Sequence, residues 1–236
     1  MRILTGLVCA FALTAGATPV TFDFTTSGGT VGGGSPFGDT RTYTNGIYSV
    51  TASSFSLPGN LAGNFTTAQL NQFGGLGLAS CNQNEGASCG PPDHQVDNDV
   101  SIDFVLFKFN TPVDPINIKF QPFGTHDTDV TYWIGNGAGL NLSSIGLSGL
   151  AGAGFGARTD SDGPILTDTS RTVLLGGGAG NYLLFAARLP GNNADSSADY
   201  FKIRSLSVDT AVPEPATFGL AGLALVGLGL LRKARK

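Results

Sequence analysis

Oxygen-bearing side chains suited to metal binding gather in two short stretches of the chain. Ca²⁺ takes six to eight oxygen ligands, and turn segments rich in Asp and Asn supply them. The sequence therefore predicts one candidate cofactor, a structural calcium ion, held by residues of both stretches: Glu85, Asp97, Asn98, Asp99, Asp127 and Asp129. The regular acidic spacing of an EF-hand loop is absent, so solvated turns and Asx caps are the competing interpretation.

Two of the three cysteines, Cys81 and Cys89, are close enough in sequence to form a short disulfide. In an oxidising compartment such a pair is expected to be bonded, which would stabilise the fold by about 2–3 kcal/mol. A metal pair completed by His94 or His126 is the alternative. No C-x₂-C spacing supports that alternative.

Aromatic side chains are the candidates for binding a sugar. Sandwich lectins stack sugars on exposed aromatic rings and hydrogen-bond them through Asp and Asn. Tyr132 and Trp133 are predicted to serve here, and the competing interpretation places them in the core.

The sequence shows no arrangement typical of an active site. Glu85 is the only Glu between residues 18 and 212, so a glycosidase pair would need two suitably placed Asp residues. The chain has no G-x-S-x-G elbow, and its glycine-rich stretches lack the spacing of a dinucleotide-binding loop. We therefore predict that the protein is not an enzyme.

The charge of the chain excludes one class of partner. The segment 18–212 carries 16 acidic and 8 basic residues, whereas the whole chain has a net charge of −4. An acidic body cannot neutralise phosphates, so no nucleic-acid partner is expected.

Apolar residues alternate with polar ones along most of this acidic body, which predicts β-strands. The segment 100–109 has apolar residues on both faces, as a strand buried on both sides would. Asn45-Gly46 separates two alternating runs and predicts a hairpin. With turn residues every few positions, the pattern predicts an all-β fold, a β-sandwich or jelly roll. The glycine-rich segment 135–156 is expected to be a flexible surface loop or to carry weak strands.

The two ends of the chain predict export. Arg2, a short apolar stretch and small residues at Ala15 and Ala17 predict a signal peptide over residues 1–17. At the other end, residues 216–231 are apolar and would span roughly 24 Å as a helix, which predicts a single transmembrane helix. Four basic residues after it would hold that end in the cytoplasm: Arg232, Lys233, Arg235 and Lys236.

Pro213, Glu214 and Pro215 precede this apolar stretch, and the three parts together resemble the PEP-CTERM sorting signal of exported bacterial proteins. The resemblance implies an exosortase-type processing enzyme as a partner, with cleavage near the Pro-Glu-Pro motif. It also implies an envelope in which extracellular polysaccharide is common. The predicted organisation is a signal peptide (1–17), a β-sandwich domain outside the inner membrane (18–212) and a sorting and anchor segment (213–236).

A looser resemblance concerns the body. Asp103–Phe107 and the D-x-D-V-x-x-W pattern of Asp127–Trp133 are similar to segments of jelly-roll domains in PEP-CTERM surface proteins. We expect an exported protein, anchored briefly in the inner membrane and then displayed at the cell surface or in the extracellular matrix. Its expected role is structural or adhesive, with extracellular polysaccharide as an expected partner. A carbohydrate- or ice-binding module and a secreted hydrolase are the alternatives.

Overall fold

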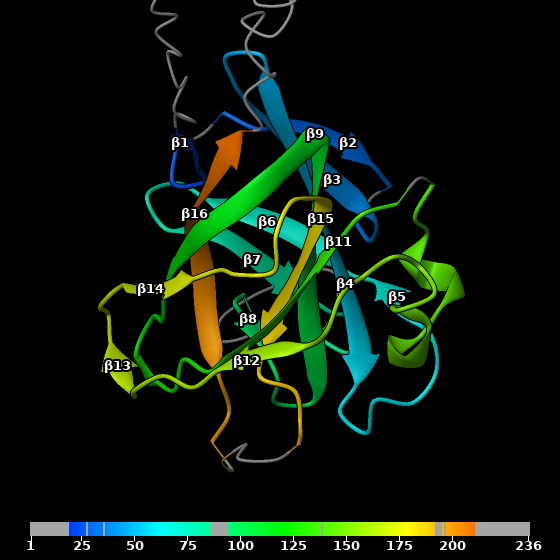
Figure 1. Ribbon diagram of the computed structural model, residues 1–236. Coiled ribbons are helices and arrows are strands. Elements are labelled where there is room, and N and C mark those ends of the chain that lie inside the picture. The colour runs from blue at the N-terminus through cyan, green and yellow to red at the C-terminus, as the bar shows by residue number, and fades with distance from the viewer. Residues whose placement is uncertain are drawn as a thin grey trace, which may run out of the picture. The chain divides into compact units, whose positions relative to one another are not determined.

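Strands account for nearly all the regular structure in the computed structural model, which describes residues 19–26, 28–34, 36–85, 94–137, 139–191, 195 and 197–210 (Figure 1). This part of the chain is all-β, which confirms the predicted class. Its strands are β1 (Pro19–Asp23), β2 (Thr30–Gly33), β3 (Asp39–Asn45), β4 (Tyr48–Pro58), β5 (Thr66–Thr67), β6 (Gln69–Phe73), β7 (Gly77–Cys81), β8 (Val96–Asp97), β9 (Ser101–Gln121), β10 (Thr125–His126), β11 (Val130–Gly135), β12 (Thr159–Ser161), β13 (Leu166–Thr167), β14 (Arg171–Leu174), β15 (Gly180–Ala187) and β16 (Tyr200–Thr210).

The long strand β9 organises the fold by pairing with different neighbours along its length. Its first half lies between β4 and β15, with Phe104 opposite both Phe55 and Ala186. Its second half lies between β14 and β16, with Ile118 opposite Val173 and Leu206. A strand that changes partners in this way connects two layers of sheet. The arrangement is consistent with a β-sandwich.

The first half of β9 is buried on both faces, as the alternation predicted. Val105, Phe107 and Phe109 face the larger hydrophobic core, together with residues of β1, β15 and β16. Ile102 and Phe104 face a second core on the opposite side of the strand. Because successive side chains of a strand point in opposite directions, one strand can join two cores.

The second core is closed by the segment 139–156, which corrects the expectation of a flexible loop or weak strands. Two short 3₁₀ helices, η1 (Leu142–Ser144) and η2 (Leu147–Gly149), shape this segment. Leu142, Leu150 and Phe155 are buried against the core side of β9 and β15. Gly146 and Gly154 of this segment serve close packing, since a Cβ at either position would lie 2.3 Å from a backbone oxygen.

The predicted hairpin is present, with its turn one residue later than the Asn45-Gly46 pair suggested. Asn45 pairs with Tyr48, so Gly46 and Ile47 form the two-residue loop. Gly46 has φ of 63°, which glycine adopts without a steric penalty. The turn thus has its positive-φ residue first, as in a type II′ hairpin.

The described residues form one unit, Pro19–Thr210. Among the described residues no helix is long and apolar enough to cross a membrane. The predicted signal peptide and transmembrane helix lie outside the described residues.

Candidate functional site

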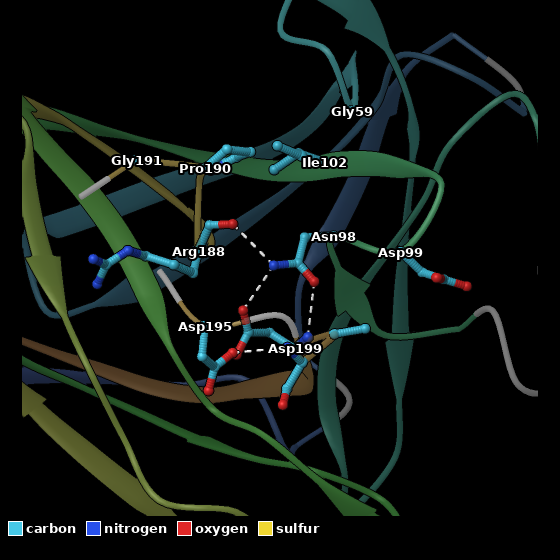
Figure 2. A pocket seen from close by; sticks show the side chains of 11 residues that line it. Gly59, Asn98, Asp99, Ile102, Arg188, Pro190, Gly191, Asp195 and Asp199 are labelled. Atoms are coloured by element: carbon cyan, nitrogen blue, oxygen red, sulfur yellow. Dashed lines mark hydrogen bonds between the residues drawn. The ribbon is translucent and has the colours of Figure 1, made fainter. Parts of the chain in front are cut away.

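A polar pocket of about 440 Å³ opens where four segments meet: the loops after β4, β8 and β15 and the segment before β16 (Figure 2). Its lining combines carboxylates, an amide and an arginine with a few apolar groups: Gly59, Asn98, Asp99, Ile102, Arg188, Pro190, Gly191, Asp195, Ser197, Ala198 and Asp199. This mixture is suited to hydrogen-bonding a polar ligand.

Asn98 holds the loops around this pocket together. Its Nδ2 donates to the backbone oxygen of Arg188 at 2.9 Å and to Oδ2 of Asp199 at 2.7 Å. Its Oδ1 accepts from the backbone N–H of Asp199 at 2.8 Å (Figure 2). With donors and acceptors satisfied by protein groups, Asn98 fixes the shape of the pocket.

Three carboxylates form an acidic group beside this pocket: Asp127, Asp129 and Asp195, whose oxygens lie within 4.8 Å of one another. Asp127 and Asp129 are buried, whereas Asp195 is exposed. Burial raises the pKa of Asp127 and of Asp129 above the usual range of an aspartate. We call these three residues the rim group.

Asp199 connects the rim group to the pocket. Its Oδ1 accepts from the backbone N–H of Asp129 at 2.6 Å. Burial raises the pKa of Asp199 to about 7, and the charges of Asp129 and Asp127 contribute to the increase. Its carboxyl therefore changes protonation state near neutral pH, at the wall of the pocket.

Two arginines balance the negative charge around the rim group. Arg188 forms ion pairs with Asp160 at 3.8 Å and with Asp162, and its charge lowers the pKa of Asp129. Arg171 donates to Thr128 and to the 161–162 turn through several hydrogen bonds. The rim group is thus held in a network of arginines and backbone N–H donors.

A second acidic group is deeper in the molecule. Glu85 follows β7, Asp97 is in β8 and Asp103 is in β9, and their carboxylate oxygens also lie within 4.8 Å of one another. We call these three residues the strand group. Burial raises the pKa of Asp103 well above its usual range, and the negative charges of Asp97 and Glu85 raise it further.

The six residues proposed for one calcium site are therefore divided. Glu85 and Asp97 belong to the strand group, and Asp127 and Asp129 belong to the rim group. Asn98 and Asp99 line the pocket. Asp99 is exposed, and its backbone N–H donates to the carboxylate of Asp97.

Sequence reasoning missed three acidic residues of these sites: Asp103, Asp195 and Asp199. Asp103 interrupts an otherwise apolar run in a strand buried on both faces, which is a signal that was available in the sequence. Asp195 and Asp199 gave no such signal, because they reach the rim group only through the fold.

Tyr132 and Trp133 are buried, which corrects the expectation that their rings bind sugar. Tyr132 is 4% exposed in the larger core, and Trp133 is 6% exposed in the second core. They occupy successive positions of β11, so they point to opposite faces and each fills a different core. Neither presents a ring face to solvent.

Some predicted residues lie outside the described residues. These are Cys89, the Pro213-Glu214-Pro215 motif and the basic residues Arg232, Lys233, Arg235 and Lys236. Cys81 is fully buried at the end of β7.

Comparison with known proteins assigns the C-terminal segment. Residues 211–236 match the family model of the PEP-CTERM protein-sorting motif, as the sequence predicted. The motif marks an exported surface protein that passes through the membrane, whose tail associates with the membrane and is recognised by an exosortase. No curated protein matches the chain.

Proposed function

We propose that the protein is a non-enzymatic component of the cell surface or extracellular matrix, with a structural or adhesive role and a jelly-roll-like body. The PEP-CTERM motif at residues 211–236 carries this proposal, because it directs the chain to the surface. The body supports it: long, continuously paired strands around two cores make a rigid domain that suits display outside the cell. The tail is the transient anchor in the inner membrane, and the exosortase is the processing partner.

Replacing the three motif residues with alanine (Pro213→Ala, Glu214→Ala, Pro215→Ala) tests the sorting step. The native protein is expected in the surface fraction without its C-terminal tail. The triple variant is expected in the inner-membrane fraction with its tail intact. A matched variant with three alanines elsewhere in the acidic body (Asp114→Ala, Asn117→Ala, Lys119→Ala) should be sorted normally. Recovery of the native protein from the cytosol with both ends intact would contradict the proposal.

The role at the surface is tested by deleting the gene in the native host. Cells without the protein are expected to form a weaker matrix, measured as reduced aggregation or biofilm cohesion. Complementation with the native chain should restore cohesion, whereas the triple motif variant should not. Normal cohesion in the deletion strain would contradict a structural or adhesive role.

Carbohydrate binding is the second candidate, and the polar pocket favours it. A volume of about 440 Å³ is within the range of small-ligand sites, and the exposed carboxylates of Asp99 and Asp195 in its lining can accept hydrogen bonds from hydroxyls. A glycan array probed with the native chain and with Asp195→Ala is the test. Binding lost in this variant but kept in Asp114→Ala would favour the pocket, and an absence of binding to any glycan would contradict it.

We also propose that Cys81 and Cys89 form a disulfide. The buried position of Cys81 at the end of β7 supports a structural rather than a reactive role. Thiol labelling after denaturation without reductant is expected to modify neither residue in the mature exported protein. Labelling of both would contradict the disulfide.

A further inference from the structure

The strand group brings together carboxylates from three separate parts of the chain. Glu85, Asp97 and Asp103 come from a turn, a short strand and the central strand β9, and their oxygens lie within 4.8 Å of one another. Asp97 is 2% exposed and Asp103 is fully buried. Three like charges at this spacing repel one another strongly away from water.

Among the described residues, polar groups satisfy the carboxylate of Asp103 only in part: interactions with Ser80 and Asn82 lower its pKa, but the pKa stays well above the usual range. Its Oδ1 accepts a long hydrogen bond of 3.5 Å from Nδ2 of Asn82. Its Oδ2 is buried and has no hydrogen-bond partner, and no cationic side chain in the described part of the chain forms an ion pair with Asp103. A buried charged oxygen without a partner is costly, so native proteins pair such oxygens or use them to coordinate metals.

We propose that the carboxylates of Glu85, Asp97 and Asp103 bind a divalent cation, and that this cation is Ca²⁺. One proton would neutralise only one of the three carboxylates, whereas a dication attracts all of them at once. The cation would also give the unpartnered Oδ2 of Asp103 a ligand. The inference does not depend on the surface role proposed above.

The ligand chemistry selects calcium among common cations. All three side chains offer carboxylate oxygens, which suit hard cations, and the group contains no His or Cys to favour zinc. Oxygens within 4.8 Å of one another can coordinate one cation, with water completing the coordination. Calcium is favoured over magnesium because Mg²⁺ demands near-ideal octahedral geometry and gives up its water reluctantly, whereas Ca²⁺ accepts several carboxylates in a flexible geometry.

The surrounding residues are arranged to support such an ion. Glu85 accepts from the backbone N–H of Asn82 at 3.0 Å and from the Asn82 side chain, which also donates to Asp103. Asp97 accepts from the N–H of Asp99 at 3.2 Å. These contacts orient the carboxylates, as outer partners of metal ligands do. The bound ion would link the turn after β7 and strand β8 to β9.

The test is a calcium titration of the full-length protein in mild detergent after EDTA treatment. Isothermal titration calorimetry with CaCl₂ is expected to show saturable binding. Thermal unfolding followed by circular dichroism is expected to shift upward by about 5–10 °C when free calcium is about 100 times the dissociation constant. Magnesium should shift the midpoint less.

Two substitutions locate the site. Asp103→Asn and Glu85→Gln each remove one ligand charge and are expected to weaken calcium binding at least about tenfold and to reduce the thermal shift. Residue 85 is partly exposed, and glutamine there keeps an oxygen that accepts from Asn82. Glu85→Gln therefore locates the site even if Asp103→Asn does not fold. Asp114→Asn, an exposed position on the same strand, is the matched control and should keep the full calcium response.

The proposal is overturned if the native chain shows neither calcium binding nor a calcium-dependent shift. It is also overturned if the response survives in both Asp103→Asn and Glu85→Gln but disappears in Asp129→Asn. That second pattern would place the ion in the rim group.

Discussion

The strand group and the rim group contain three carboxylates each, yet their surroundings differ. In the rim group, burial and the charges of Asp162 and Asp195 raise the pKa of Asp129, whereas the hydrogen bond from Gly163 and the charge of Arg188 lower it. In the strand group, the charges that act on Asp103 are those of Asp97 and Glu85, and both oppose its ionisation. One group has a cationic partner within the protein, and the other contains a buried oxygen without a hydrogen-bond partner.

This difference shows that an acidic cluster alone does not indicate a metal site. Arg171 in β14 and Arg188 after β15 lie close to the rim group, so an ion has less negative charge to offset there. The strand group lacks such a balance at Asp103, so an ion from solution has a structural role to fill there. The two groups should therefore respond to a different extent when charges are removed.

Arg188→Met should give the largest change, because it removes the counter-charge of the rim group. Arg188 is 4% exposed, and its loss leaves the carboxylates of Asp160 and Asp162 without this partner. The free energy of unfolding should fall by about 3–5 kcal/mol. Urea unfolding followed by Trp133 fluorescence measures it. Arg158→Met, which removes a more exposed ion pair, should cost about 1 kcal/mol or less. Equal costs would show that the rim group does not depend on Arg188.

The pH dependence of the free energy of unfolding tests Asp199, which accepts a hydrogen bond from Asp129 of the rim group. Its pKa is about 7 in the folded protein and near its ordinary value of about 3.9 in the unfolded chain. Between these values the folded state binds more protons, so stability should fall as pH rises from about 4 to about 7. The loss attributable to this carboxyl is up to about 4 kcal/mol. Chemical unfolding at a series of pH values in EDTA measures how the free energy of unfolding changes with pH. The Asp199→Asn variant should show a weaker pH dependence between about pH 4 and 7. A slope unchanged in this variant would contradict the assignment.

Removing a charge from each group in the absence of metal should give effects of different size. Asp103→Asn in EDTA should stabilise the protein by about 1–3 kcal/mol, since it relieves repulsion at a buried site. Asp129→Asn should change stability by less than about 1 kcal/mol, because the hydrogen bond from Gly163 and the charge of Arg188 offset part of the cost of burying this carboxylate. Effects of the same size in both variants would mean that the two groups are equivalent.

Lys202 extends the comparison to a buried cation. Its Nζ is fully buried, 4.1 Å from the ring centroid of Phe123, and burial lowers its pKa to about 8. Lys202→Met should stabilise the protein by about 1–2 kcal/mol at pH 7, because the desolvated charge is lost and the ring contact is kept. Lys108→Met, an exposed change on β9, should alter stability by less than about 0.5 kcal/mol. Destabilisation by Lys202→Met would indicate that the cation–ring contact outweighs desolvation.

The sequence predicted the strands whose alternation is clean and missed those whose pairing is decided by tertiary contacts. The two-sided burial of Ile102–Phe109 and the hairpin near Gly46 followed from local pattern. Strands β6 and β7 were missed because Asn71, Gln72 and the flanking glycines resemble a loop. The continuation of β9 past Pro112 and Pro115 was also unexpected, since proline usually ends a strand unless it lies at an edge or a bulge.

The candidate sites show the same limit. Glu85 and Asp97 were suggested by their closeness in sequence, but spacing could not divide the acidic residues between two groups. Asp103 reaches Glu85 and Asp97 because β9 passes beside both segments, and Asp195 reaches Asp127 and Asp129 from the segment before β16, which is distant in sequence. Contacts of this kind depend on strand pairing and are not encoded in a local motif.

Anomalous diffraction from crystals grown with calcium tests most directly whether the strand group, and not the rim group, binds the ion. The expected result is an anomalous peak about 2.3–2.6 Å from carboxylate oxygens of Glu85, Asp97 and Asp103, with none among Asp127, Asp129 and Asp195. A peak in the rim group with an empty strand group, or no peak in either, would contradict it.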